Sequence, residues 1–239
     1  MHGAPLARVA GGVPYEQYGP DIREGISHAN RALFVNLLGS EWIPSILDLH
    51  ARLQAEPPAK VADIGCGTGW SSISLARAYP KVQIYGYDPD EASIATAKSN
   101  AEVEGLSDRG RFRVHDASDP SLSGRYDLAM AIECIHDMAR PVQALRTMRG
   151  LVGETGTVLV VDERVGESFV APGDEIEQMY YGFSVLHCLP VGMAESPSAG
   201  TGTVMRPDVL RGYAQEAGFR DIEILPIEHD LWCFYRLVS

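Results

Sequence analysis

The stretch Val61-Ala62-Asp63-Ile64-Gly65-Cys66-Gly67-Thr68-Gly69-Trp70 decides how this chain folds. Residues 60–64 are typical of a short buried strand, and three glycines, each separated by one residue, follow directly. Glycine lets the backbone turn sharply and approach a ligand where a Cβ would collide. In doubly wound α/β sheets, ligands bind beyond the carboxyl ends of the strands. The sequence therefore predicts a cofactor at this loop.

The spacing of the glycines discriminates between cofactors. A dinucleotide-binding loop has the pattern GxGxxG, with the pyrophosphate on the helix N-terminus. Here the pattern is GxGxG, with an acidic residue two positions upstream. It resembles the first motif of the class I S-adenosylmethionine-dependent methyltransferases, whose loop cradles the methionine and ribose of the cofactor. A purely structural glycine turn is the alternative. The cofactor-binding residues that the resemblance implies in this loop are Asp63, Gly65, Cys66, Gly67, Gly69 and Trp70.

Two further acidic positions support an adenosine site. Asp88 ends the second predicted strand, where a carboxylate can accept charge-assisted hydrogen bonds from both ribose hydroxyls. Nicotinamide-binding domains carry an acid at the same place, so Asp88 indicates adenosine binding in general. The resemblance adds Pro89, and it implies that Asp116 accepts from the adenine amine while the Ala117 amide meets a ring nitrogen. Alternatively, Asp116 caps the turn with Ser118.

Strand-like and helical segments alternate after this loop, which predicts a parallel sheet wrapped by right-handed crossovers. The predicted strands are 60–64, 82–87, 111–115, 127–132, 157–161, 221–227 and 231–237. The predicted helices are 71–79, 91–104, 141–151 and 207–217. Residues 164–205 carry Gly, Pro and aromatic residues and predict an irregular stretch.

The last two strands are joined by the short link Glu228-His229-Asp230, which allows only an antiparallel pair. We therefore expect an α/β fold with a Rossmann-like, doubly wound, seven-stranded sheet that ends in a C-terminal antiparallel hairpin. This three-layer α/β/α plan is the layout of class I methyltransferases. Residues 23–54 predict an N-terminal helical cover, which Glu56-Pro57-Pro58 ends. The expected division is a cover at 1–56 and a catalytic domain at 57–239.

The end of the fourth predicted strand supplies the candidate catalytic residues, Glu133 and His136. The resemblance places this edge beside the methionine moiety and the acceptor, so Glu133 is also a cofactor-binding candidate. His136 titrates near neutral pH and can take a proton from an acceptor hydroxyl or amine. The alternative is a His136 that only packs or caps the next helix. Asp137 is expected to orient neighbouring groups rather than act as the base.

The acceptor pocket is expected between the N-terminal segment and the insertion after the fifth strand. The candidates are Tyr15 and Tyr18 from the first segment, and Tyr180, Tyr181 and His187 from the second. Such an aromatic cluster is equally typical of a core. No metal site is expected.

Composition limits the partners. The chain has 32 acidic and 20 basic residues and a formal charge of -12, which disfavours nucleic acids and anionic membranes. Four scattered cysteines without a CxxC pair do not suggest a disulfide framework, so a reducing cytoplasm is expected. There is no secretory-signal pattern, and no apolar run approaches the roughly 20 residues that span a bilayer. We expect a small-molecule methyl acceptor.

A closer resemblance lies in residues 184–190 and 201–207, which look like a bacterial subgroup of these methyltransferases. Its members often carry an N-terminal winged-helix or dimerisation domain, for which this chain has no room. We therefore expect either a fragment or a version that lost the domain, and a homodimer is one expected state. The predicted function is S-adenosylmethionine-dependent methyl transfer. The alternatives are a non-catalytic S-adenosylmethionine-binding regulatory module and, less favoured by the glycine spacing, a nicotinamide-dependent oxidoreductase.

Overall fold

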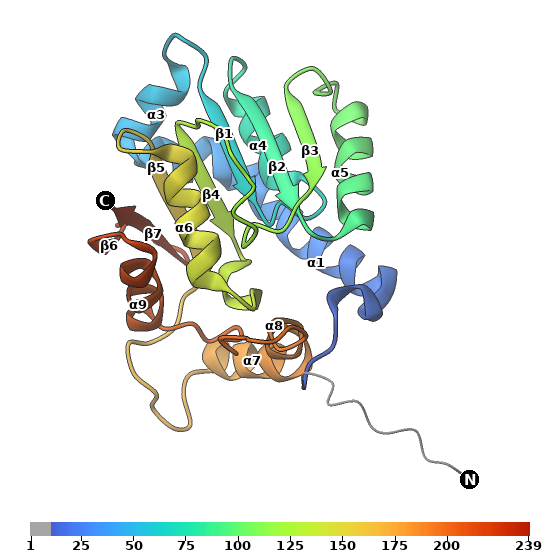
Figure 1. Ribbon diagram of the computed structural model, residues 1–239, viewed down its shortest axis with the longest axis vertical. Coiled ribbons are helices and arrows are strands. Elements are labelled where there is room, and N and C mark those ends of the chain that lie inside the picture. The colour runs from blue at the N-terminus through green and yellow to red at the C-terminus, as the bar shows by residue number, and fades with distance from the viewer. Residues whose placement is uncertain (1–10) are drawn as a thin grey trace.

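The computed structural model describes residues 11–239 as a sheet between two layers of helices (Figure 1). Seven strands pair in the order β3-β2-β1-β4-β5-β7-β6, which confirms the predicted fold. Their bounds are β1 Lys60–Ile64, β2 Gln83–Asp88, β3 Gly110–Val114, β4 Leu128–Ile132, β5 Thr157–Glu163, β6 Asp221–Ile224 and β7 Trp232–Val238. The first five strands pair in parallel, and β7 runs antiparallel to both β5 and β6.

The strand order creates a crevice between β1 and β4. The chain first builds outward from β1 through β2 to β3, then returns to the other side of β1 to add β4 and β5. The connections that leave β1 and β4 therefore diverge onto opposite faces of the sheet. Ligands of open α/β sheets bind at this switch point, outside the carboxyl ends of the strands.

Each face of the sheet is buried by its own set of helices. One hydrophobic cluster joins the sheet to α4 (Trp70–Ala78) and α5 (Glu91–Val103), with Ile73 and Ile94 fully buried. The opposite cluster joins it to α6 (Pro141–Val152) and α9 (Pro207–Ala217), with Leu145 and Leu210 buried. The central strand β4 is buried at all five positions, as expected for a strand covered on both faces.

The N-terminal cover is part of the same core. It comprises η1 (Tyr15–Tyr18), α1 (Gly19–Leu33), the π-helical η2 (Phe34–Trp42), α2 (Ile43–Ser45) and α3 (Leu47–Gln54). Leu38 and Trp42 are buried in the cluster that also contains β1 and α4. Within residues 11–239, no single helix has the length and apolar character to cross a bilayer. Segments 15–45 and 47–54 reach that threshold only when counted together, and they meet at a bend of 108°.

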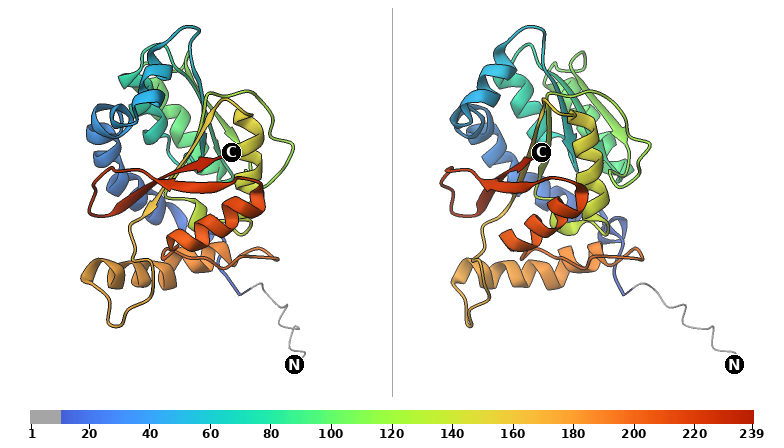
Figure 2. Two further views of the ribbon diagram at one scale, coloured as in Figure 1. Left: turned by 90° about the vertical axis from the view of Figure 1, so that its left-hand side faces the viewer. Right: turned by 60° about the vertical axis from the view of Figure 1, so that its left-hand side comes forward.

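The prediction of an irregular stretch at 164–205 is wrong for much of its length. A nearly continuous helix runs through α7 (Glu175–Phe183), η4 (Ser184–Cys188) and α8 (Leu189–Gly192). The Asp174 carboxylate caps its start by accepting from the Glu177 amide at 2.8 Å. Figures 1 and 2 show this helical segment below the carboxyl edge of the sheet, close to the start of α1.

The C-terminal hairpin is confirmed, but its link is longer than predicted, because β6 ends at Ile224 and β7 begins at Trp232. Pro226 has no N–H to continue the ladder. The His229 ring nitrogen accepts from the Leu231 and Trp232 amides, which holds the longer loop in place.

Candidate active site

The glycine loop after β1 has the backbone that its sequence requires. Gly65, Gly67 and Gly69 have φ values of +67°, +50° and +84°, a region that disfavours side chains. A Cβ on Gly65 would lie 2.6 Å from the Cys134 Sγ atom, so this position is also closed by packing. A Cβ on Gly67 would meet nothing within 4 Å and would project into open space. The loop thus presents bare backbone to its surroundings.

Asp63 lies beneath the loop rather than on a cavity wall. Its carboxylate is buried and accepts hydrogen bonds from the Ser71 and Ser72 hydroxyls at 2.7 and 2.6 Å. Burial raises its pKa to about 6 even though both hydroxyls favour the charged form. Asp63 therefore ties the end of β1 to the first turn of α4 and fixes the loop between them.

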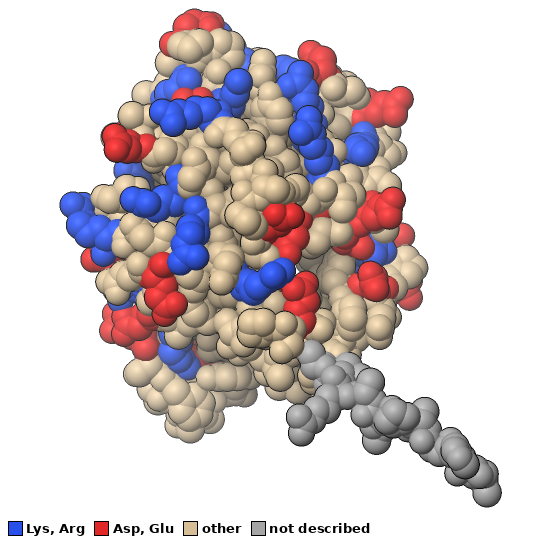
Figure 3. Space-filling view, in the orientation of Figure 1, with Lys and Arg blue, Asp and Glu red and all other residues tan. Residues whose placement is uncertain are grey.

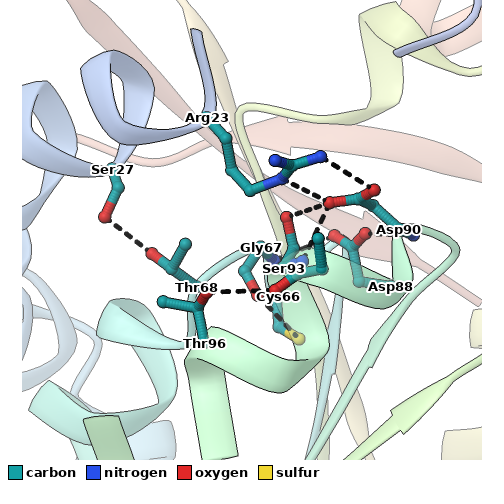
Figure 4. A network of polar contacts seen from close by, with 10 residues as sticks. Arg23, Ser27, Cys66, Gly67, Thr68, Asp88, Asp90, Ser93 and Thr96 are labelled. Carbon is teal, nitrogen blue, oxygen red and sulfur yellow. Dashed lines mark hydrogen bonds and ion pairs between the residues drawn. The ribbon is translucent and has the colours of Figure 1, made fainter. Parts of the chain in front are cut away.

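Asp88 closes the loop from the end of β2. Its Oδ2 atom accepts from the Gly67 amide at 2.9 Å, and its Oδ1 atom accepts from the Asp90 amide at 2.8 Å. Burial raises its pKa to about 6. Figure 4 shows Asp88 close to Asp90 and to the loop at Cys66 and Gly67.

Helix α1 contributes a polar stripe to the same place (Figure 4). The Arg23 guanidinium donates to both oxygens of Asp90, at 2.6 and 3.2 Å, and Ser27 and Thr68 share a hydrogen bond of 2.7 Å. Asn30 donates to Glu133 at 3.2 Å. These α1 residues were not predicted from the sequence. The available signal was their spacing of four and three, which places them on one helix face.

A cavity of about 400 Å³ runs over the carboxyl ends of the first four strands. Its floor includes Gly65, Gly67, Asp88 and Pro89, and its cover comes from residues 14–16 and 191–195 together with Ile26. A smaller chamber of about 80 Å³ extends under α1 and is lined by Cys66 and Trp70. Gly69 and Ala117 line neither chamber, since Gly69 starts α4 and Ala117 is buried. The two chambers share several lining residues, namely Tyr15, Ile26, Gly65, Gly67, Ser93 and Glu133.

One end of the cavity is formed by Asp116 and Ser118 after β3. Asp116 caps its own turn by accepting from the Ser118 amide and hydroxyl at 2.8 and 2.7 Å, the contact that we considered as an alternative. It also lies on the cavity wall, so the cap does not remove it from the site. Arg140 bridges Asp116 and Glu195 at 3.0 and 3.1 Å and joins this end to the segment after α8.

Glu133 leaves β4 in a backbone conformation that side chains rarely adopt, with a φ of +57°. Its carboxylate faces both chambers, and burial raises its pKa to about 7. Non-glycine residues in this region store strain and cluster at functional sites. The sequence placed Glu133 at the site, but only the structure gives this geometry.

His136 lies behind the cavity wall, within a cluster of carboxylates. Its Nδ1 atom lies 2.7 Å from an Asp162 oxygen and 3.0 Å from a Glu163 oxygen, and its Nε2 atom lies 3.1 Å from Asp137. Burial alone lowers the pKa of His136, but the charges of Asp162, Glu163 and Asp137 raise it well above the usual value. The ring is buried behind the wall, and it is Asp137 that lines the cavity.

The structure brings only one of the five aromatic and histidine pocket candidates to the cavity. Tyr15 lines both chambers. Tyr18 and His187 pack ring against ring behind it, with centroids 4.7 Å apart. The Tyr180 hydroxyl donates to the Leu231 carbonyl, and the Tyr181 hydroxyl accepts from Arg206, so both face away from the lining. Their helix packs across the edge of the sheet, and the sequence alone did not show where this helix would lie.

The known proteins that this chain resembles include methyltransferases. Residues 56–195 match a family model described as a methyltransferase domain. The ajmaline N-methyltransferase of Rauvolfia serpentina is 28% identical over 105 residues, which cover 44% of this chain and 36% of the relative.

Two solved structures share the fold. PigF with SAH has a TM-score of 0.68 at 18% identity, covering 92% of this chain and 58% of that one. An O-methyltransferase (NcsB1) from neocarzinostatin biosynthesis, in complex with S-adenosyl-L-homocysteine and 1,4-dihydroxy-2-naphthoic acid, has a TM-score of 0.65 at 18% identity, covering 91% and 57%. The chain therefore spans less than two thirds of the length of these proteins.

Proposed function

Because this chain belongs to the methyltransferase domain family, we propose that it transfers the methyl group of S-adenosylmethionine to a small-molecule acceptor. The observation that carries the proposal is the covered cavity at the carboxyl ends of β1 to β4, with the glycine loop and Asp88 in its floor. The bare backbone at Gly67 supports close approach of a ligand, because a Cβ there would project into open space.

The cofactor sites follow the order of the strands. We propose that Gly65 and Gly67 bind the methionine end, that Asp88 accepts the ribose hydroxyls and that Asp116 accepts from the adenine amine. Pro89 lines the floor beside Asp88, Cys66 and Trp70 line the smaller chamber, and Asp63 and Gly69 hold the loop from below and behind. Glu133 faces the region where the cationic part of the cofactor would lie, and a carboxylate there is favourable.

The protein's contribution to the chemistry is positioning and exclusion of water. Bound S-adenosylmethionine supplies a methyl group that its sulfonium charge has already activated. The cover formed by Tyr15, Ile26 and residues 191–195 confines the acceptor above the cavity floor. Holding two reactants in line in this way accounts for much of an enzyme's rate.

Glu133 and His136 are our two candidates for the group that takes a proton from the acceptor. Glu133 faces the cavity, and its pKa of about 7 suits a general base at neutral pH. His136 takes part only through Asp137, because its ring nitrogens face Asp137 and Asp162. An acceptor that is already nucleophilic needs neither group.

Calorimetry with S-adenosylmethionine, S-adenosylhomocysteine and NAD tests the cofactor. We expect micromolar binding of the first two, about -7 to -8 kcal/mol, and none of NAD. Absence of heat with either methionine-derived ligand, on folded protein, would refute the proposal. Turnover in an acceptor screen then separates an enzyme from a regulatory module that only binds the cofactor.

Other features that the sequence suggested are proposals as well. We propose a division into the cover at 1–56 and the catalytic domain at 57–239, a cytoplasmic location in a bacterium, no nucleic-acid or membrane partner, and a homodimer. Sedimentation of the purified chain tests the oligomeric state, and fractionation tests the location.

A further inference from the structure

The charge on the cavity wall is strongly one-sided. Seven carboxylate residues line the cavity, but within the described part of the chain only one basic side chain, Arg140, does so. In the space-filling view, acidic groups lie around the hollow in the lower right part of the face, whereas most basic groups lie above and to the left (Figure 3). Three of the seven, Asp88, Asp116 and Glu133, are in our proposal cofactor ligands.

The basic groups nearest to the cavity are already paired. Arg140 is held between Asp116 and Glu195 at 3.0 and 3.1 Å. Arg23, which lines the smaller chamber, holds both oxygens of Asp90. An acidic acceptor would therefore have to displace an existing ion pair to find a positive partner. It would also have to approach carboxylates, and like charges in a confined site repel strongly.

Two carboxylates on the acceptor side have no arginine or lysine partner within 4 Å among residues 11–239. These are Glu16, from η1 in the cover, and Asp137, after β4. The Asp137 side chain is 24% exposed, and its buried oxygen lies against the His136 ring at 3.1 Å. Around them, the wall is apolar at Pro14, Met138 and Val191. Such a surface suits a molecule with an apolar body and a positive group.

We propose that the methyl acceptor carries a basic amine, bound as its cation by Glu16 and Asp137, and that acceptors bearing carboxylate or phosphate are rejected. This inference rests on the proposed function, because it concerns the acceptor of the same site. The cofactor's own positive charge does not reverse the preference, because carboxylates outnumber the basic groups on the wall by a wide margin. The selectivity concerns recognition alone and leaves the methylated atom open.

Matched acceptor pairs test the proposal. Protein saturated with S-adenosylhomocysteine is titrated calorimetrically with amine and carboxylate partners that share a scaffold, such as tyramine and 3-(4-hydroxyphenyl)propanoate, over one-ring, two-ring and alkyl scaffolds. We expect the amines to bind at least about tenfold more tightly, which corresponds to about 1.4 kcal/mol. Methylation of the same compounds with S-adenosylmethionine is followed by release of S-adenosylhomocysteine.

Charge variants locate the selectivity. Glu16→Gln and Glu195→Gln should each reduce the amine preference about threefold or more, the second because it frees one side of Arg140. Glu223→Gln, on the exposed edge strand β6, changes the net charge equally and should leave the preference unchanged. Equal or tighter binding of the carboxylate series overturns the inference, as does failure of both series while S-adenosylhomocysteine still binds. Loss of S-adenosylhomocysteine binding in the unmodified protein instead counts against the proposed function itself.

Discussion

Replacing Asp88 with asparagine removes a negative charge from the cavity floor and almost nothing from its shape. In the structure each carboxylate oxygen of Asp88 already accepts one backbone N–H, from Gly67 and from Asp90, so each has one acceptor position left. Hydrogen bonds to a charged group are worth about 1.5–3 kcal/mol each. Because the existing donors share the charge, we expect the two bonds together to be worth about as much as one such bond, about 1.4–2.7 kcal/mol or ten- to a hundredfold in affinity. Asp88→Ala should lose as much.

The pH dependence supplies the sharper test. Burial raises the pKa of Asp88 to about 6, so the carboxylate is ionised at pH 7.5 and only about one tenth ionised at pH 5. If the ribose hydroxyls donate to the ionised form, affinity falls about tenfold over that range as the pH is lowered. Adenosine is the appropriate ligand, since it has the ribose but lacks the methionine moiety that faces Glu133.

The assay is calorimetric titration of adenosine at several pH values between 5 and 8. Wild-type affinity should rise with pH and level off above pH 7, and Asp88→Asn should be weak and flat. Glu133→Gln is the matched control, because it removes another carboxylate of the cavity whose pKa is raised. It should leave the pH dependence of adenosine binding unchanged. A flat wild-type profile, or an Asp88→Asn protein that keeps both its affinity and its pH dependence, refutes the assignment of Asp88 to the ribose.

Four further predictions concern a buried histidine, the base, a buried acid and the glycine loop. His136→Ala should lower the free energy of unfolding by roughly 3–5 kcal/mol, because it leaves buried carboxylates without a positive partner. The stabilisation that His136 gives the wild type, measured by thermal denaturation, should be complete below about pH 6.5. It should disappear as the pH rises through the raised pKa of His136. On a true acceptor and at saturating cofactor, the variant that removes the base, His136→Ala or Glu133→Gln, should turn over about a hundred- to ten-thousandfold more slowly, and normal rates in both would mean that no base is required. Asp63→Asn should be more stable relative to wild type at pH 8 than at pH 5, by about 1.4 kcal/mol. The raised pKa of about 6 makes wild-type stability fall as the pH rises from about 4 to 6, and about half of that fall lies above pH 5. One oxygen of Asp63 accepts both serine hydroxyls, and a pH-independent difference in melting temperature would contradict this prediction. Gly65→Ala should destabilise the protein by roughly 1–3 kcal/mol in denaturant titrations, since its Cβ meets Cys134. Gly67→Ala should mainly weaken cofactor binding, because its Cβ meets no other atom. Equal melting temperatures for Gly65→Ala and wild type would disprove the packing argument.

The sequence determined the fold through features that act locally along the chain. The glycine spacing at Gly65, Gly67 and Gly69 specifies a sharp turn whatever surrounds it, because only glycine tolerates that backbone. The alternation of short apolar runs with helical segments indicated a parallel sheet. A helix between two strands carries the chain back across the sheet, so that the next strand runs in the same direction as the one before it. Asp88 was predictable because it ends the second predicted strand, and the position of that strand follows from the local sequence pattern.

The sequence failed where the outcome depends on packing against distant residues. The segment at 164–205 was expected to be irregular from its Gly, Pro and aromatic content, but helix α7 and its continuation form because that segment buries Tyr180 and Cys188 beneath the sheet edge. Propensity is a weak prior that such tertiary burial overrides. The aromatic residues of α7 then face away from the cavity instead of lining it.

His136 and the α1 stripe show the same division. The sequence showed that His136 follows β4, but the three carboxylates that surround it come from β5 and from its own turn, and only the assembled sheet brings Asp162 and Glu163 to the ring. Arg23 and Asp90 lie far apart in the chain and meet because α1 crosses the loop after β2. The sequence by itself determined which strand ends carry the proposed cofactor-binding groups, since each group follows its own strand. The pKa values of those groups and the charge on the cavity wall were decided only by the tertiary structure, because burial and ion pairing are properties of residues from different strands and helices.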